Sequence, residues 1–310
     1  MNQPDANPVV SNPPGGTPVG LGHTSWADRP VPGGGIASRR RVNVAGVLID
    51  DLKMAETFSE IERLVRLGRP SFIVTPNVDH IVRLQSDSAL QAAYNDAALV
   101  LPDGMFVLWG SRFLGTPLRA KVSGSDLLPQ FASFAAAKGM RLFFLGGRPD
   151  AARKSAEVLS QRHPGLTIQW HCPPMGFEKD PAENRKAVQM VRESRSDVLF
   201  VGLGAPKQEL WMHRYYREYS VPVSIGIGAT FEFVSGMVRR APRLLQKTGL
   251  EWLWRLALEP MRMYRRYLID DPFFFALIWK QRRNRLAALA RPTDKLTSII
   301  ASARPQVGSA

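Results

Sequence analysis

Short apolar runs alternate with amphipathic segments from about residue 42 to residue 229. The runs are rich in β-branched side chains, and this is typical of strands that are buried on both faces. The predicted strands span residues 42–49, 71–75, 98–101, 141–147, 166–171, 197–204 and 221–229. The predicted helices span 52–67, a stretch ending near 94, a segment starting near 105, 149–163, 181–194 and 207–219. The alternation predicts an α/β fold with a doubly wound, mostly parallel, Rossmann-like sheet.

The pattern changes after Gly236, where basic residues interleave with apolar and aromatic ones. Residues 239–291 hold thirteen Arg and Lys against four Asp and Glu, a net charge of +9. Between residues 253 and 268, apolar side chains recur at spacings of three and four, which predicts basic amphipathic helices. Pro260 suits the first turn of a second helix better than the interior of one long helix. The following "DPFFFALIWK" is too short to span a bilayer but suits its interface.

These changes predict four segments. Residues 1–41 form a disordered leader rich in Pro and Gly, and residues 292–310 a disordered tail. The α/β core spans 42–237, and a basic helical appendage spans 238–291. No signal peptide and no apolar run long enough to span a bilayer is found, so we expect a cytoplasmic protein with peripheral membrane contact. The single cysteine, Cys172, excludes an intrachain disulfide and, with His171, is expected to belong to the core.

The formal net charge of +14 points to an anionic partner. Nucleic acid, an acidic membrane surface and a phosphorylated substrate all have the required charge. Composition does not choose among them.

Polar residues gather at the ends of the predicted strands. Thr75 and Asn77 follow one strand, Asp103 follows another, and "LGG", "GAPKQE" and "GATFEF" end three more. In an open α/β sheet, ligands bind beyond the carboxyl ends of the strands, so five such ends predict one shared cleft. Asp103 comes directly after the apolar run "ALVLP", where neighbours that disfavour its charged form raise its basicity.

Known cofactor motifs do not account for this cleft. "GLGAPK" and "GIGATF" begin like a dinucleotide fingerprint but lack its last glycine, and no phosphate loop of the GxxxxGK[ST] type exists. The five histidines show no metal-ligand spacing. We therefore predict neither a cofactor nor a metal, and expect Arg, Lys and backbone N–H groups to balance the charge of any diphosphate leaving group.

Seven motifs together are specific for a family. "TPNVDH", "LVLPDG", "KVSGSDLL", "FFLGG", "VGLGAPKQE", "GIGATFEFVSG" and "RAPRLLQKTGLEWLWRLALEPMRMYRRYL" resemble, in this order, the WecG/TagA/CpsF glycosyltransferases, glycosyltransferase family 26. The resemblance covers roughly residues 42–270 and implies a bacterial inverting enzyme. Such an enzyme moves an N-acetylmannosamine-type sugar from a UDP donor to a sugar on undecaprenyl diphosphate, in cell-surface polysaccharide biosynthesis. It also implies a C-terminal appendage that docks on the membrane and completes the active site.

The resemblance assigns roles residue by residue. Asp103 matches the proposed catalytic base, which would accept the proton of the acceptor hydroxyl in a single displacement. Thr75 and Asn77 match polar residues that line the pocket around the two sugars. Gln208 matches a further sugar or diphosphate contact. The appendage arginines thought to reach the diphosphate correspond to Arg255, Arg262 and Arg265.

Three positions depart from the family pattern. Lys121 stands where relatives commonly have arginine, which keeps the charge but loses the planar fork for phosphate. Phe177 replaces a tyrosine near the nucleotide, and Glu232 replaces an aspartate that could meet the ribose. Because of these differences, the sequence does not identify the exact donor sugar.

Other readings of the same residues stay open. Asp103 and Gly104 also fit a turn or a helix cap. The basic appendage also fits a nucleic-acid-binding α/β protein, although apolar residues at helical spacing favour an anionic membrane surface over nucleic acid. A UDP-sugar-binding protein without turnover is a third interpretation, and the sequence is also compatible with a homo-oligomer.

Overall fold

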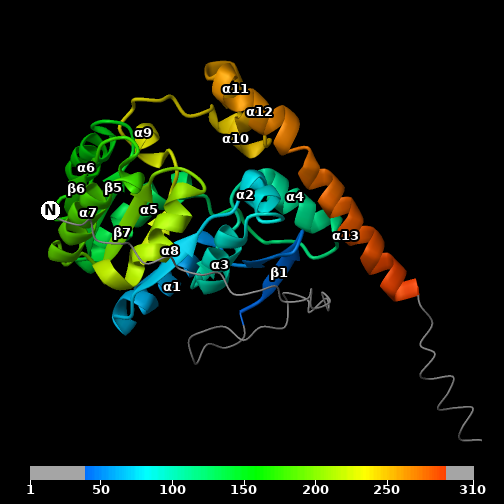
Figure 1. The fold of residues 1–310 in the computed structure, drawn as a ribbon, viewed down its shortest axis with the longest axis horizontal. Helices are drawn as coiled ribbons and strands as arrows, with labels where there is room; N and C mark the ends of the chain where they lie inside the picture. The colour runs from blue at the N-terminus through cyan, green and yellow to red at the C-terminus, as the bar shows by residue number, and fades with distance from the viewer. Residues whose placement is uncertain (1–38, 291–310) are drawn as a thin grey trace, which may run out of the picture.

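The computed structural model describes residues 39–290, except the side chains of Arg243, Lys247, Arg262, Arg266, Tyr267 and residues 288–290. The predicted tail at 292–310 and nearly all of the predicted leader lie outside the described residues. The centre of the molecule is a sheet of six parallel strands (Figure 1). In spatial order they are β4 (Leu99–Val100), β3 (Ser71–Val74), β8 (Val223–Gly226), β7 (Val198–Gly202), β5 (Arg141–Gly146) and β6 (Thr167–His171). The predicted parallel α/β fold is confirmed.

Helices cover both faces of the sheet, so alternate residues of each strand enter two different cores. Phe72 and Val74 of β3 belong to one core, whereas Ile73 belongs to the other. The first core includes side chains of α2 (Val78–Arg83), α3 (Ser88–Asp96), α4 (Met105–Phe113), α7 (Pro181–Glu193) and α8 (Lys207–Tyr219). The second includes side chains of α1 (Met54–Leu67), α5 (Gly124–Lys138), α6 (Ala151–Arg162) and α9 (Thr230–Val234).

Two predictions of local structure were wrong. The expected single strand at 42–49 is an antiparallel hairpin of β1 (Arg41–Val44) and β2 (Val47–Asp50). Ala45 and Gly46 both have positive φ, 50° and 89°, which turns the chain between two short strands. The second error is an omission. One helix, starting near residue 105, was expected before the strand at 141, but the chain forms α4 and then α5 there.

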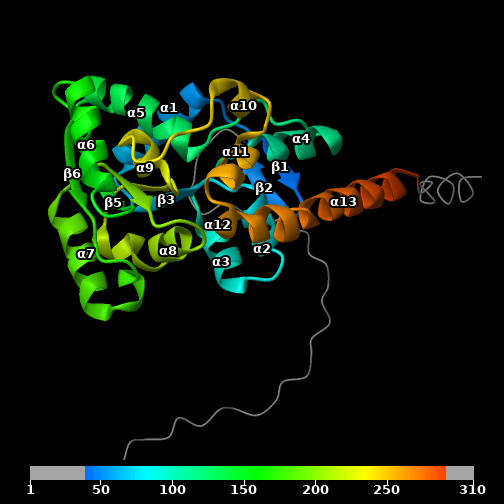
Figure 2. The same ribbon diagram turned by 90° about the horizontal axis from the view of Figure 1, so that it is seen from above.

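The C-terminal part is helical and lies across one end of the body (Figures 1 and 2). It comprises α10 (Arg243–Lys247), α11 (Glu251–Leu258), α12 (Pro260–Arg265), the π-helical turn η3 (Arg266–Asp270) and α13 (Phe273–Ala290). As predicted, Pro260 begins a separate helix, because its ring cannot continue α11. Gln281 of α13 binds the β1–β2 hairpin: its Nε2 donates to the Asn43 carbonyl at 3.0 Å, and its Oε1 accepts from the Ala45 N–H at 2.6 Å.

Candidate active site

Asp103 lies just beyond the carboxyl end of β4, in a junction of three loops. Its backbone N–H donates to the carbonyl of Pro76, which follows β3, at 3.0 Å. The carbonyl of the preceding Pro102 accepts from Val122, which leads into α5, at 2.8 Å. These bonds fix the backbone around Asp103. The N-cap position of α4 is occupied by Gly104, which has no side chain to cap the helix, rather than by Asp103.

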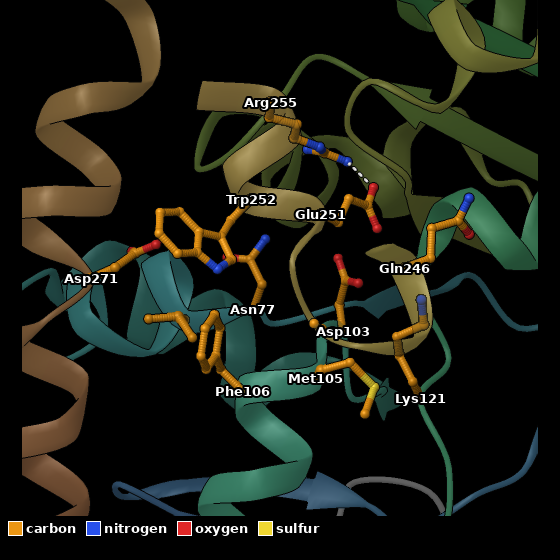
Figure 3. A pocket seen from close by; sticks show the side chains of 13 residues that line it. Asn77, Asp103, Met105, Phe106, Lys121, Gln246, Glu251, Trp252, Arg255 and Asp271 are labelled. Atoms are coloured by element: carbon orange, nitrogen blue, oxygen red, sulfur yellow. Dashed lines mark hydrogen bonds and ion pairs between the residues drawn. The ribbon is translucent and has the colours of Figure 1, made fainter. Parts of the chain in front are cut away.

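A cavity of about 120 Å³ surrounds this carboxylate (Figure 3). Asn77, Asp103 and Lys121 line it from the α/β body, and α11 closes it with Glu251, Trp252 and Arg255. The remaining lining residues are Val78, Gly104, Met105, Phe106, Gln246, Gly249 and Asp271. Four residues predicted from the sequence therefore meet in one cavity: Asn77, Asp103, Lys121 and Arg255.

The surroundings of Asp103 favour its protonated form. Burial raises the pKa of this carboxyl above the usual range for aspartate, and the nearby charge of Glu251 raises it further. Lys121, Arg255 and His80 act in the opposite direction without cancelling the shift. A carboxylate with raised pKa is a stronger base, as proton abstraction from a hydroxyl requires.

A chain of ion pairs connects the cavity walls. Lys121 Nζ lies 2.9 Å from Asp126 Oδ2, and Arg240 lies 2.7 Å from Asp126 Oδ1. Glu251 Oε1 lies 4.0 Å from Arg240 and 3.0 Å from Arg255. Burial alone would raise the pKa of Asp126, but hydrogen bonds and charges from Lys121, Ser123 and Arg240 lower it overall. The charged Asp126 thus holds Lys121 and Arg240 in place at the N-terminus of α5.

A second cavity of about 260 Å³ shares Glu251 and Arg255 with the first. Glu232 is 6% exposed and lines this cavity, and its Oε1 accepts from the backbone N–H of Arg148 at 2.9 Å. The Arg255 guanidinium lies over the Phe233 ring, 5.1 Å from its centre. The Glu251–Arg255 ion pair therefore forms the partition between a cavity with Asp103 and a cavity with Glu232.

Other predicted site residues line neither cavity. Thr75 Oγ1 donates to the Gly226 carbonyl of the neighbouring strand at 3.1 Å. Gln208 is buried, and its side-chain oxygen accepts from the Gly228 N–H at 2.9 Å. Phe177 is buried in the core, with its ring centre 6.3 Å from that of Trp211. These three side chains support the fold around the site.

Of the three appendage arginines predicted from the sequence, Arg255 lines both cavities. Arg265 is exposed and does not line them, and the side chain of Arg262 lies outside the described residues. The sequence reasoning missed Gln246, Glu251, Trp252 and Asp271 as lining residues. The first three belong to the same long C-terminal motif as Arg255, so this motif was the available signal.

No helix among residues 39–290 is both long and apolar enough to cross a membrane. Within the same part of the chain, no three His, Cys, Asp or Glu side chains gather closely enough to hold a metal ion.

Comparisons with known proteins identify the family of this chain. The sequence profile of the glycosyl transferase WecG/TagA/CpsF family matches residues 42–288. A Bacillus spizizenii protein is 30% identical over 216 residues, 70% of this chain and 81% of the relative. A Staphylococcus aureus protein is 26% identical over 245 residues, 78% of this chain and 94% of the relative. Both relatives are named N-acetylglucosaminyldiphosphoundecaprenol N-acetyl-beta-D-mannosaminyltransferase. The profile covers the α/β body and most of the appendage, and the chain therefore belongs to the WecG/TagA/CpsF family and is a glycosyltransferase.

Proposed function

We propose that this enzyme transfers an N-acetylmannosamine-type sugar from a UDP donor to N-acetylglucosamine on undecaprenyl diphosphate. The names of the relatives support the transferred sugar and the lipid-linked acceptor. The observation that carries the proposal is the carboxylate of Asp103, with its raised pKa, in a cavity also lined by Lys121 and Arg255. This arrangement combines a base with cations suited to a diphosphate.

The reaction is a single displacement. Asp103 accepts the proton of the acceptor hydroxyl. At the same time, the oxygen of that hydroxyl bonds to the anomeric carbon of the donor sugar. The bond from that carbon to the UDP oxygen breaks, UDP leaves with the bonding electrons, and the configuration inverts. Lys121, Arg255 and Arg148 balance the charge that develops on UDP, in place of a metal ion.

The two cavities suit the two parts of the donor. The larger cavity offers the buried carboxylate of Glu232, which suits ribose hydroxyls, and Arg148 for phosphate. The smaller cavity, which Asp103 lines, would hold the reacting sugars. The diphosphate would lie between them and compete with Glu251 for Arg255.

We also propose that residues 238–291 dock the enzyme on the inner face of the cell membrane. Apolar side chains of this segment are exposed beside arginines, a combination that favours an anionic bilayer interface. They are Leu253, Leu258, Met261, Tyr264, Leu268, Ile269, Phe273, Phe275 and Trp279. Docking of this kind would bring the cavity next to a lipid-linked acceptor.

The decisive experiment is an assay of UDP release with the purified full chain, a panel of UDP-sugars and a synthetic lipid-linked N-acetylglucosamine acceptor. We expect release only when donor and acceptor are both present. Turnover should persist with EDTA, and NMR of the product should show an inverted anomeric centre. Salt-sensitive nucleic-acid binding without turnover would favour the nucleic-acid reading, and UDP-sugar binding without turnover would favour a sensor.

Replacement of the base tests its role. Asp103→Asn is close in shape but cannot accept the proton, so we expect turnover to fall by about 10²- to 10⁴-fold while donor binding persists. Initial rates and donor titrations measure the two effects separately. Asp197→Asn, at a carboxylate that binds Arg141 at the start of β5, is the matched control and should retain activity. Full activity of Asp103→Asn would disprove the base assignment.

A further inference from the structure

The two edges of the central sheet differ in how the described chain covers them. At β4, the β1–β2 hairpin lies against the edge, and the N–H of Val100 donates to Asp50 Oδ2 at 2.8 Å. At β6, no further strand among residues 39–290 pairs on the outer side. β6 therefore presents an open edge, to which another strand can add.

The hydrogen bonds of β5 show which backbone groups of β6 point outward. Within a strand, successive residues direct their N–H and C=O groups alternately to the two neighbouring strands. The Arg141 carbonyl accepts from the N–H of Asp197, which leads into β7, at 2.8 Å. The N–H of Gly147, just past β5, donates to the last carbonyl of β7, also at 2.8 Å. Odd-numbered residues of β5 thus bond to β7, and even-numbered ones bond to β6.

The register between β5 and β6 then identifies the outward groups. Even-numbered residues of β5 stand opposite even-numbered residues of β6. In a parallel pair, each residue bonds to the two neighbours of its partner, so the odd-numbered residues of β6 bond to β5. The N–H and C=O groups of the other two, Ile168 and Trp170, point away from the sheet.

The side chains of β6 form a symmetric pattern. Its sequence "TIQWH" alternates polar and apolar residues about Gln169 at the centre. In an antiparallel pair of two β6 strands, with the two Gln169 residues opposite each other, Ile168 of each copy faces Trp170 of the other. Every outward N–H and C=O group then meets a partner, and each β-branched side chain meets an aromatic ring. The edge is therefore complementary to itself.

β6 lacks the features that usually prevent an edge strand from pairing. Such strands are commonly protected by lysine, by proline or by a bulge. β6 contains no Lys, Arg, Asp, Glu or Pro, and its register with β5 is unbroken. Burial and the nearby Lys186 lower the pKa of His171, so its ring is neutral at pH 7. Trp170 is 42% exposed, and a partner strand would cover an apolar ring that the single chain leaves in solvent.

We propose that two copies of this chain form a dimer through β6, so that their sheets join into one. The two-fold axis passes between the two Gln169 residues. Association stops at two copies, because the hairpin covers the edge at β4. β6 lies at the far end of the sheet from β4 and from Asp103 (Figure 1). The dimer therefore involves neither cavity, and its formation does not depend on the proposed function.

Light scattering of the full chain measures the association. We expect the wild type to have twice the mass of one chain. Trp170→Lys puts a charge into both symmetric apolar pairs, so it should raise the dissociation constant about 10-fold or more. Leu67→Lys, at another exposed apolar side chain, is the matched control and should leave the mass unchanged. A wild-type chain that is monomeric at every concentration would overturn the proposal, including when another part of the chain covers β6.

Disulfide cross-linking tests the register. Gln169→Cys is made together with Cys172→Ser, so that the chain has no other cysteine. In the proposed dimer the two copies of residue 169 are directly opposed, with Cα atoms about 4.5 Å apart, which a disulfide can span. We expect a covalent dimer after mild oxidation. Its absence would overturn the proposed register.

Thr167→Cys in the same Cys172→Ser background is the matched control. Residues 167 and 169 are both exposed and lie on the same face of β6. The two copies of residue 167 would be roughly 14 Å apart along the strands, too far for a disulfide. We therefore expect no covalent dimer from Thr167→Cys. Equal cross-linking of both variants would indicate random collisions and would contradict the dimer.

Discussion

Single residues at the site owe their chemistry to neighbours far away in the sequence. Asp103 is flanked by Lys121 on one side and by Glu251 and Arg255 of α11 on the other. The cations lower its pKa, whereas burial and Glu251 raise it. The pKa of the proposed base thus depends on two opposing sets of charges, and each set can be changed separately.

The acid side of the pH–rate profile measures this balance. The base must be ionised, so kcat/KM should rise with pH through the pKa of Asp103, at a higher pH than for an ordinary aspartate. Lys121→Met removes a charge that lowers this pKa, so the rise should move to higher pH. Glu251→Gln removes a charge that raises it, so the rise should move to lower pH. Shifts in the same direction in both variants would contradict the assignment.

The sequence predicted Asn77, Asp103, Lys121 and Arg255 as site residues, and all four line the cavity. It did not predict that Thr75 would bind the backbone of β8. A polar residue at a strand end can bind either a ligand or the adjacent strand. The choice depends on which strand is adjacent, and β8 lies about 150 residues from β3.

At the scale of elements, the alternating pattern located the six sheet strands but missed the hairpin. In "VNVAGVLI" the apolar pattern continues through the turn, so periodicity does not record the reversal of the chain. The apolar pattern of the sequence also did not predict where α13 packs. It crosses α4 at Gly110, where a Cβ atom would lie only 2.9 Å from the Phe274 ring.

This contact predicts the effect of Gly110→Val. The added side chain would force α13 away from α4, at a cost of about 1–3 kcal/mol for overpacking. We expect lower thermal stability together with lower activity, because α13 continues from the segment that closes the cavity. Unfolding curves and UDP release measure the two effects. Ala137→Val introduces valine at an exposed helix position and should leave activity intact. A fully active Gly110→Val enzyme would argue against this packing.

At the scale of the whole molecule, the proposed membrane surface and the cavity belong to the same helices. Trp279 of α13 stacks with Phe113 of α4, and Arg282 lies 4.2 Å from the centre of the Phe113 ring. Both aromatic rings remain partly exposed. A bilayer that binds these helices would also hold the cavity wall in place.

Two methionines of equal exposure allow a matched test. Met261 of α12 is 86% exposed, and Met175, which follows β6, is 85% exposed. Met261→Glu should weaken flotation with anionic liposomes and lower turnover on the lipid acceptor, because it puts a charge in the proposed interface. Met175→Glu should change neither. Equal loss in both variants would point to general repulsion by the added charge.

The position of Gln281 on the β1–β2 hairpin has a consequence for synthesis on the ribosome. The sheet, Asp103 and Lys121 are all translated before α11 and α13, and α13 must return to the first hairpin of the described chain to complete its packing. A nascent chain can therefore form its sheet while the cavity still lacks a wall. The carboxylate of Asp103 is enclosed only after the helices proposed to meet the membrane have emerged, so an unfinished chain is not expected to consume sugar nucleotide.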